Sequence, residues 1–372
     1  MIPQNPFLLA GYQGPDYFCN RTDETRKLVQ ALENGRSVTL MAPRRMGKTG
    51  LIKNVFYRLD EEKKEVVTIY MDIFSTQNLR EFVQVFASAV IGALGEESGS
   101  TLEKIGAFFK SLRPALIFDE YTGTPKITLD VVANQEETTL QTIFEHLQSS
   151  GKQCYIAIDE FQQIAEYPEK GVEAQLRSYI QFVPHVTFLF AGSKNHLMQE
   201  MFLSAKRPFF QSTQIQSIEA IDQKIYYEFA SRFFMEKERT FPEDIFASLY
   251  NDFSGHTWYV QSILNRLYSY SHVVDKESLA YAVNEIVGEN EYQYQNLLSL
   301  QTPGEIRLLK AIAKEGVVTE INAGHFIAKY DLKAASSVNS SLKRLIDKEL
   351  VYKDNEGYTI YDRFMAIWLR KL

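Results

Sequence analysis

The chain has 372 residues, of which 45% are hydrophobic and 23% are charged, and its formal net charge is −7. This length predicts two or three domains, and the composition is typical of a globular protein that buries a large core. The negative charge excludes a protein covered with basic surface for gripping nucleic acid, and allows at most a local basic face.

The sequence also argues against export, membrane insertion and structural metal. The first six residues, Met-Ile-Pro-Gln-Asn-Pro, have neither the basic start nor the apolar run of a secretory signal. No stretch approaches the roughly 20 apolar residues that cross a bilayer. The two cysteines, Cys19 and Cys154, are far apart and show no zinc-like spacing with other Cys or His residues. We therefore expect a cytoplasmic protein with no membrane contact and no structural metal.

Residues 1–220 alternate between short strand-like runs and longer amphipathic stretches. Strands are predicted at 37–41, 66–72, 153–159 and 186–191, with a further short strand at 214–218. Helices are predicted between them at 51–60, 79–94, 138–150 and 173–182. Because strands alternate with helices, we predict an α/β domain over residues 1–220, with a parallel sheet in the middle of three layers.

A segment between the first strand and the next helix has the form of a Walker A phosphate loop. Its residues are Ala42, Pro43, Arg44, Arg45, Met46, Gly47, Lys48 and Thr49. In such a loop, backbone N–H groups and a helix N-terminus surround the β-phosphate of ATP. Gly47 lets the backbone approach closely, Lys48 reaches the phosphate oxygens from a solvent-facing position, and the Thr49 hydroxyl binds Mg²⁺. Ala42 replaces the usual first Gly, which is tolerable only where its φ is negative.

Two segments could supply the carboxylate that this loop needs at the end of a neighbouring strand. Asp119 and Glu120 lie between two alternating runs around a Gly turn, which predicts a hairpin inserted at 113–132. Asp159 and Glu160 follow a buried run and precede another helix and strand, as a core strand requires. We choose Asp159 as the second magnesium ligand and Glu160 as the residue that orients the attacking water. This Asp-Glu order also predicts a strand between the P-loop strand and the acidic strand.

Other polar residues near these strand ends are candidates for nucleotide contacts. Ser193, or else Asn195, follows the fourth strand and is placed to reach the γ-phosphate or the water. Arg21 precedes an amphipathic helix, where it either contacts the nucleotide or pairs with an acid. Arg44 and Arg45 face phosphate, a neighbouring subunit or solvent, and the sequence does not distinguish these.

Beyond residue 220 the strand-like runs disappear and two further domains are predicted. Residues 221–300 contain three or four helices, which we interpret as a helical lid with a turn at Gly255-His256. Residues 301–372 show the element order of a winged helix-turn-helix. The predicted elements are helices at 305–315, 320–329 and 334–348, a hairpin at 350–353 and 358–360, and a final helix.

The last domain is a candidate for contact with DNA or with a protein. The outward residues of its third helix are predicted to be Ser337, Asn339, Ser340, Lys343 and Arg344. Residues 301–372 contain 12 Lys and Arg against 9 Asp and Glu, a net charge of +3. This charge is low for a domain that must neutralise several phosphates, so protein docking is the first interpretation and DNA the second.

With these motifs in place, the chain resembles the archaeal-type ATPase family, in the STAND branch of the AAA+-like NTPases, which also occurs in bacteria. The resemblance covers nearly the whole chain, including the winged helix. The matching segments are residues 5–7, 18–23, 43–49, 156–160, 191–193 and 254–261. It implies ATP and Mg²⁺ as ligands, a nucleotide-driven switch, a lid turn with His256 over the nucleotide, and an arginine finger, for which Arg207 is the candidate.

Two segments depart from the family pattern. Thr257 follows Gly255-His256 where the family usually has Pro, and Arg207 stands in Lys-Arg-Pro where the family tends to have Gly-Arg. Both departures suggest slow hydrolysis. An arginine finger would act on the γ-phosphate of a neighbouring copy, so ATP would then favour a homo-oligomer.

The leading interpretation is an ATP-hydrolysing molecular switch that docks a partner through the winged helix. Its predicted catalytic residues are Glu160, Lys48, Ser193 and Arg207. A second interpretation is an ATP-regulated DNA-binding protein in which hydrolysis is incidental. A third is a scaffold that retains ATP and hardly hydrolyses it. The sequence does not identify the partner, the signal or the pathway.

Overall fold

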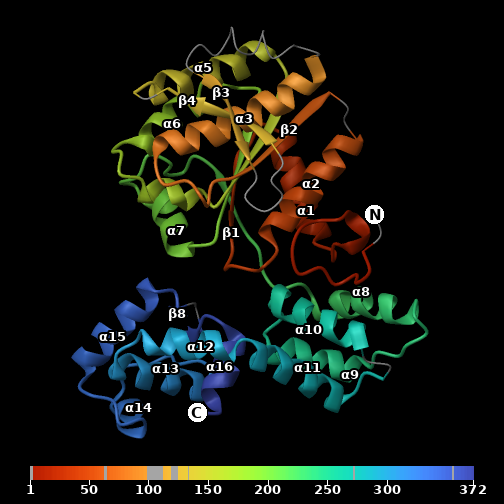
Figure 1. Cartoon of the computed structure of the whole chain (residues 1–372), viewed down its shortest axis with the longest axis vertical. Coiled ribbons are helices and arrows are strands. Elements are labelled where there is room, and N and C mark those ends of the chain that lie inside the picture. The colour runs from red at the N-terminus through yellow and green to blue at the C-terminus, as the bar shows by residue number, and fades with distance from the viewer. Residues whose placement is uncertain are drawn as a thin grey trace. The chain divides into compact units, whose positions relative to one another are not determined.

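The computed structural model describes residues 3–62, 65–98, 112–118, 125–132, 134–270, 273–353 and 356–372. Side chains are described for these residues except within 95–98 and 112–130. Two compact units are present, and Figure 1 shows their elements. The first unit is Ala10–Tyr226. The second combines Met1–Leu9 with Tyr227–Leu372. The chain therefore passes from one unit to the other twice.

The first unit is built on five parallel strands in the order β2-β5-β6-β1-β7. The strands are β1 (Val38–Met41), β2 (Val66–Asp72), β5 (Gln153–Asp159), β6 (Val186–Gly192) and β7 (Gln214–Ser217). All five lie within a residue of the predicted bounds. Because β6 pairs with both β1 and β5, the predicted strand between the P-loop strand and the acidic strand is confirmed.

Helices cover both faces of this sheet (Figure 1). On one face lie α1 (Thr22–Glu33) and α2 (Lys48–Glu62), and on the other α3 (Leu79–Ser98), α5 (Glu136–Ser150), α6 (Val172–Ile180) and α7 (Asn195–Leu203). Successive side chains of β6 alternate between the two cores: Phe188 and Phe190 pack with α3 and α5, whereas Leu189 and Ala191 pack with α1 and α2. The continuous apolar runs are thus explained by burial on both faces, and the predicted three-layer fold is confirmed.

The hairpin predicted around residue 120 is also present. Antiparallel strands β3 (Leu112–Phe118) and β4 (Pro125–Val131) pair with each other, and neither joins the parallel sheet. Asp119 and Glu120 lie outside the described residues. The preceding strand β3 is therefore not a strand of the parallel sheet, which supports the choice of β5 as the acidic strand.

The second unit begins with helices that enclose the start of the chain. The described part of 221–300 contains five helices, whereas three or four were predicted. One helix ends at Glu289 and the next begins at Glu291, so Asn290 divides this stretch into two helices. They are α8 (Gln223–Met235), α9 (Glu243–Asp252), α10 (Thr257–Tyr270), α11 (Lys276–Glu289) and α12 (Glu291–Ser299). Phe7 is fully buried against Phe234 and Tyr268. Asn265 Nδ2 donates to the carbonyl of Phe7 at 2.8 Å. The first residues therefore pack with the helices, whereas the sequence grouped them with residues 10–220.

The predicted winged helix is confirmed and is packed against these helices. It comprises α13 (Pro303–Glu315), α14 (Gly324–Lys329), α15 (Ala335–Asp347), β8 (Val351–Lys353), β9 (Tyr358–Ile360) and α16 (Arg363–Arg370). The hydroxyl of Tyr259 on α10 donates to the Tyr361 carbonyl at 3.3 Å and accepts from the Arg363 N–H at 3.2 Å. The ring of Phe364 packs on Phe253 and Tyr259. Residues 227–300 and the winged helix thus belong to one compact unit.

Among the described helices, none combines the length and the apolar character required to span a bilayer.

Candidate active site

The predicted phosphate loop lies at the carboxyl edge of the sheet, where β1, β5 and β6 end side by side. It runs from the end of β1 to the start of α2. Gly47 adopts φ 89° and Arg45 adopts φ 66°, so two loop residues are left-handed. Ala42 is not among the residues with positive φ, and its side chain is buried in the core beneath α1 and α2. The methyl group at this position is therefore accommodated without backbone strain.

Lys48 is folded back over its own loop. Its Nζ donates to the carbonyls of Ala42 at 2.8 Å and Pro43 at 3.0 Å, and the residue is only 5% exposed. The expectation of a solvent-facing lysine is therefore wrong, because the loop carbonyls converge on the ammonium group. Burial lowers the pKa of Lys48 to about 8, against the opposing effect of the nearby carboxylates of Glu160 and Asp159.

The two predicted magnesium ligands lie together. Thr49 Oγ1 donates to Asp159 Oδ2 at 2.6 Å, and Asp159 is 2% exposed at the end of β5. The hydroxyl of Tyr70 on β2 donates to the same oxygen at 3.1 Å. Burial and the Asp159 carboxylate raise the pKa of Tyr70, so its phenol stays protonated and remains a donor. Two hydroxyl groups thus orient one carboxylate oxygen.

The carboxylate of Glu160 is held by two side chains. Ser193 Oγ donates to Glu160 Oε2 at 2.7 Å, and Gln162 Nε2 donates to the same oxygen at 2.5 Å. Gly192, at the end of β6, makes room for this arrangement. A Cβ there would lie 2.3 Å from Gln162 Oε1 and 2.5 Å from Met198 Sδ. The candidate general base is therefore positioned by a residue of the next strand and by η2 (Phe161–Glu166), which follows β5.

The remaining loop arginines and Asn195 occupy different surroundings. Arg44 Nε donates to Ser193 Oγ at 3.3 Å, which brings its guanidinium to the same cluster. Arg45 is exposed. Asn195 begins α7, and its buried Oδ1 has no hydrogen-bond partner among the described residues. Of the two residues considered after the fourth strand, Ser193 is the one that touches Glu160.

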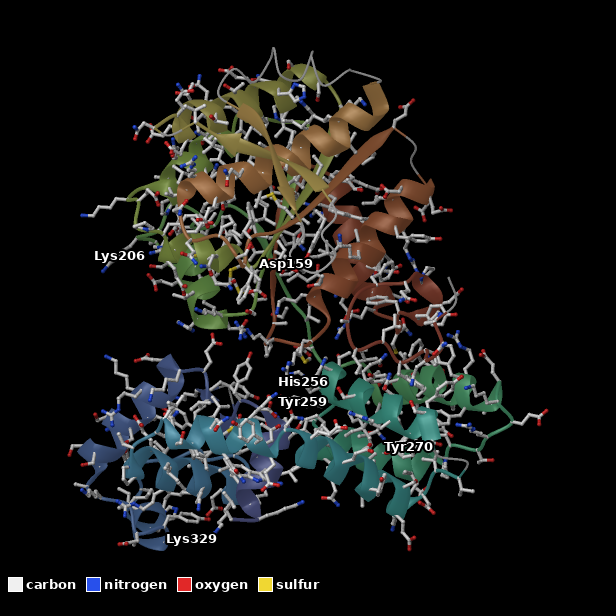
Figure 2. All side chains as sticks on the ribbon, in the orientation of Figure 1. Asp159, Lys206, His256, Tyr259, Tyr270 and Lys329 are labelled. Carbon is white, nitrogen blue, oxygen red and sulfur yellow. The ribbon has the colours of Figure 1, made fainter. Side chains whose placement is uncertain are left out.

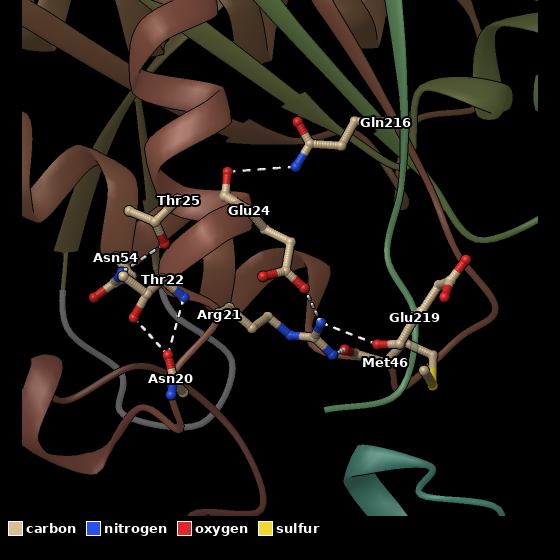
Figure 3. A network of polar contacts seen from close by, with 9 residues as sticks. All are labelled: Asn20, Arg21, Thr22, Glu24, Thr25, Met46, Asn54, Gln216 and Glu219. Atoms are coloured by element: carbon tan, nitrogen blue, oxygen red, sulfur yellow. Dashed lines mark hydrogen bonds and ion pairs between the residues drawn. The ribbon is translucent and has the colours of Figure 1, made fainter. Parts of the chain in front are cut away.

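Arg21 lies beneath the phosphate loop with its side chain only 1% exposed (Figure 3). Its Nη2 donates to the Met46 carbonyl at 2.9 Å, and its Nη1 donates to Glu24 Oε1 and to the Glu219 carbonyl, each at 3.0 Å. It pairs with an acid, as one of the two sequence-based alternatives stated, and it also binds the loop backbone.

Arg207 is bound within the first unit. Its guanidinium pairs with Glu173 on α6 and lies 3.3 Å from a carboxylate oxygen of Glu200 on α7. A finger acting on a neighbouring copy would have to leave both partners. That role stays a prediction.

His256 belongs to the second unit, where Figure 2 shows it close to Tyr259. The two ring centroids are 4.8 Å apart. Its predicted contact with the nucleotide stays a prediction.

The residues present fit a magnesium ion. In nucleotide sites this ion takes one or two protein oxygens and completes its shell with phosphate oxygens and water. Thr49 Oγ1 and Asp159 Oδ2 are oxygen ligands 2.6 Å apart, at the mouth of the loop. No cluster of three or more His, Cys, Asp or Glu side chains that could hold a metal occurs in the described part of the chain. These two oxygens would suit a metal ion that is shared with a phosphate ligand.

Two site residues escaped the sequence analysis. Tyr70 could have been found from the strand order, because β2 pairs with β5 and sets Tyr70 opposite Ala157, two residues before Asp159 and on the same face of the sheet. Gln162 could not have been predicted, because no sequence pattern distinguishes one of two adjacent glutamines in a polar turn from an ordinary surface residue. Only the packing of η2 against Gly192 directs it toward Glu160.

Comparisons with known proteins agree with this geometry. A family model described as an ATPase domain predominantly from Archaea matches residues 18–263, and one described as a probable winged helix domain matches residues 292–371. No curated protein matches the chain.

Several solved structures share the fold over nearly the whole chain. A Walker-type ATPase of Pyrococcus abyssi is 17% identical with a TM-score of 0.66, covering 98% of this chain and 99% of its own. The ORC2 protein of Aeropyrum pernix, solved as ADPNP-ADP complexes, is 15% identical with a TM-score of 0.61, covering 98% and 96%. The ORC1 protein of the same organism, solved with DNA, is 13% identical with a TM-score of 0.55, also covering 98% and 96%.

The first family model spans 246 of the 372 residues and includes the phosphate loop, the acidic pair and Ser193. This chain therefore belongs to the family of ATPase domains found predominantly in Archaea, and its C-terminal region is a winged helix domain.

Proposed function

We propose that this protein binds ATP with Mg²⁺, hydrolyses it slowly, and uses the nucleotide state to control the docking of a protein partner on its winged helix. The observation that carries the proposal is the meeting of Lys48, Thr49, Asp159, Glu160 and Ser193 at one edge of the sheet. These groups come from three different strand ends and supply the parts that phosphoanhydride hydrolysis needs.

In the proposed reaction, the loop amides hold the β-phosphate and Lys48 exchanges its two carbonyl acceptors for phosphate oxygens. Thr49 and Asp159 would hold Mg²⁺, which neutralises charge on the phosphates when bound. Glu160 takes a proton from water as the water oxygen attacks the γ-phosphorus, and the bond to the ADP oxygen breaks. Gln162 fixes the orientation of Glu160 during this step.

The switch would operate through contacts that depend on the γ-phosphate. Ser193 now donates to Glu160 and accepts from Arg44, so a γ-phosphate that attracts either group rearranges the cluster. A ligand shifts a conformational equilibrium only by its difference in affinity for the two states, and ADP lacks these contacts. In the second unit, Tyr259 binds the helices to the winged helix. We infer that any movement of α8–α11 would carry the winged helix with it.

A second candidate is DNA binding, favoured by the similar fold of the ORC1 protein that was solved with DNA. All five predicted outward residues of α15 are exposed. However, Arg344 Nε donates to Glu305 Oε1 at 2.5 Å, and Lys348 Nζ lies 3.6 Å from Glu305 Oε2. Lys343 is then the only one of the five that brings a positive charge with no ion-pair partner among the described residues. Such a face would neutralise few phosphates, so a protein partner fits better.

Three measurements test these proposals. Glu160→Gln should trap the ATP state, so its scattering profile in Mg·ATP should differ from that in Mg·ADP. Identical profiles would exclude the switch. Native mass spectrometry of the same samples tests ATP-dependent self-association. Titration with duplex DNA at two salt concentrations separates the partners: tight, strongly salt-dependent binding would favour the DNA-binding alternative.

A further inference from the structure

Arg21 is a buried charge held by the backbone as well as by an ion pair. Its hydrogen bonds include two to main-chain carbonyls and one to Glu24. Burial lowers the pKa of Arg21, and Glu24, whose side chain is 27% exposed, opposes this effect. A buried cation destabilises the folded state unless its N–H groups are hydrogen-bonded or paired with an opposite charge. The two carbonyls that Arg21 binds therefore help to offset the desolvation of its guanidinium.

The local backbone is also in a rare conformation. Asn20 and Arg21 both adopt left-handed φ values, 42° and 47°. The side chain of Asn20 stabilises this turn, because its Oδ1 accepts from the N–H of Thr22 at 3.1 Å and from the Thr22 hydroxyl at 2.5 Å. Although Arg21 is the N-cap residue of α1, its side chain makes no capping hydrogen bond. The turn instead directs the guanidinium under the phosphate loop (Figure 3).

The bond to Met46 fixes the orientation of a peptide in the phosphate loop. In a trans peptide the C=O and the following N–H point in opposite directions, and the described chain contains no cis peptide. Because Arg21 holds the Met46 carbonyl on its side, the N–H of Gly47 points away from Arg21. Gly47 immediately precedes α2, and the N–H groups at this place are those that cradle phosphate. Loss of Arg21 would free this peptide to rotate.

The second carbonyl links the loop to the exit from the first unit. Glu219 follows β7, whose neighbour in the sheet is β1. The first unit ends at Tyr226, seven residues beyond Glu219. One guanidinium thus binds both the residue before Gly47 and the segment that leads to the second unit.

We propose that Arg21 is a positioning residue that keeps the phosphate loop in its anion-binding form and couples that form to residues 219–226. In this role it acts through the loop backbone. This proposal rests on the proposed nucleotide site and adds a route by which occupancy of the loop reaches the second unit.

The test compares Arg21→Met, Arg21→Lys and a matched control, Thr25→Val. Thr25 lies one turn later on α1, is 1% exposed, and its Oγ1 accepts from Asn54 Nδ2 at 3.2 Å, away from the loop (Figure 3). The control therefore weakens the packing of the same helix without touching the Met46 peptide. Thermal unfolding measures stability, calorimetry measures the Kd for Mg·ADP, and hydrogen exchange measures how ADP protects residues 219–226.

Arg21→Met should weaken ADP binding about 10- to 100-fold and abolish ADP-dependent protection of residues 219–226. Arg21→Lys should lie between this variant and the parent, because an ammonium group reaches fewer of the three acceptors. Thr25→Val should lower the unfolding temperature and leave the Kd within about threefold of the parent. If Arg21→Met does not fold, Arg21→Lys against Thr25→Val decides.

Two results would overturn the inference: ADP affinity that follows unfolding temperature across all variants, or unchanged affinity and unchanged protection in both Arg21 variants. Lys48→Met separates this failure from failure of the proposed function. If Lys48→Met loses ADP while the Arg21 variants keep it, the nucleotide site stands and the positioning role falls. If Lys48→Met also binds ADP like the parent, the nucleotide site itself is wrong.

Discussion

Replacing Lys48 by Met is expected to remove most of the ATP affinity and yet leave the ligand-free protein slightly more stable at pH 7. Met keeps a stem of similar length and removes only the ammonium group. Burial lowers the pKa of Lys48 from 10.5 to about 8, which corresponds to a cost of about 3 kcal/mol for holding the charged form in the folded state. The hydrogen bonds to the carbonyls of Ala42 and Pro43 return about 1 kcal/mol each. The net gain for the variant is therefore about 1 kcal/mol.

The pH dependence distinguishes this reasoning from simple loss of packing. Because the pKa of Lys48 is lower in the folded state, the unfolded chain binds more protons between about pH 8 and 10.5, and this contribution to stability rises with pH across that window. The Met variant lacks this rise. Its advantage at pH 7 should shrink above pH 8 and reverse at about pH 9, because the cost of the charge falls by about 1.4 kcal/mol per pH unit. By about pH 10.5 the parent should be the more stable protein, because neutral Lys48 still donates to the loop carbonyls.

Binding follows a separate argument. Loss of one charge-assisted phosphate contact costs about 1.5–3 kcal/mol, which is roughly 10- to 150-fold in Kd. Calorimetry with Mg·ATP measures this loss, and urea unfolding at pH 7 and pH 10 measures stability. Parent-like ATP binding by Lys48→Met would refute the phosphate-loop assignment. A variant that is less stable by the same amount at both pH values would refute the buried-charge argument.

Three further predictions test other parts of the molecule. Glu160→Gln should keep Mg·ATP binding and slow phosphate release by roughly 10²- to 10⁴-fold. Glu120→Gln should leave the rate of phosphate release nearly unchanged. The opposite outcome would assign the catalytic carboxylate to Glu120 instead of Glu160. Gly192→Ala should lower the free energy of unfolding in urea by about 1–3 kcal/mol, because the new Cβ would lie 2.3 Å from the buried Gln162 side chain. The same change should slow turnover, because Gln162 holds Glu160. Parent-like stability and turnover would show that the surrounding side chains adjust to the methyl group. Burial would raise the pKa of Glu305, but its hydrogen bonds to Arg344 and to the Thr302 cap outweigh this effect and lower the pKa to about 2. The contribution of Glu305 to stability should therefore be lost as the pH falls from about 4.5 through 2. Glu305→Gln should remove that part of the acid transition measured by circular dichroism, and an unchanged transition would contradict the assignment.

Much of the first unit follows from local sequence. The bounds of β2 and β5 coincide with the predicted strands. All residues of β5 after the first are buried, whereas β2, at the edge of the sheet, alternates between buried and partly exposed residues. The edge at which the site lies follows as well, since parallel strands place their carboxyl ends together. Thr49, Asp159 and Ser193 could thus be predicted as neighbours before their contacts were known.

Other features depend on contacts that no local pattern encodes. Phe7 belongs to a short N-terminal segment without periodicity, and only the aromatic cluster of α8 and α10 shows where it packs. The burial of Lys48 depends on carbonyl groups, which every residue carries and no sequence reveals. The same is true of Arg21, whose acceptors at Met46 and Glu219 are both main-chain oxygens. Side-chain identity predicted the acidic and hydroxyl parts of the site, and backbone geometry determined the rest.

The chain connectivity gives the Arg21 contacts their importance for a switch. The chain enters the first unit after Leu9 and leaves it after Tyr226, so both connections to the second unit start near Arg21 and Glu219 in sequence. The bond between Arg21 Nη1 and the Glu219 carbonyl joins these two segments, and Nη2 of the same group holds the phosphate loop. A change in the loop that weakens one of these bonds therefore acts on both connections at once. Within the second unit, Tyr259 joins α10 to the winged helix, so we infer that these two parts move together.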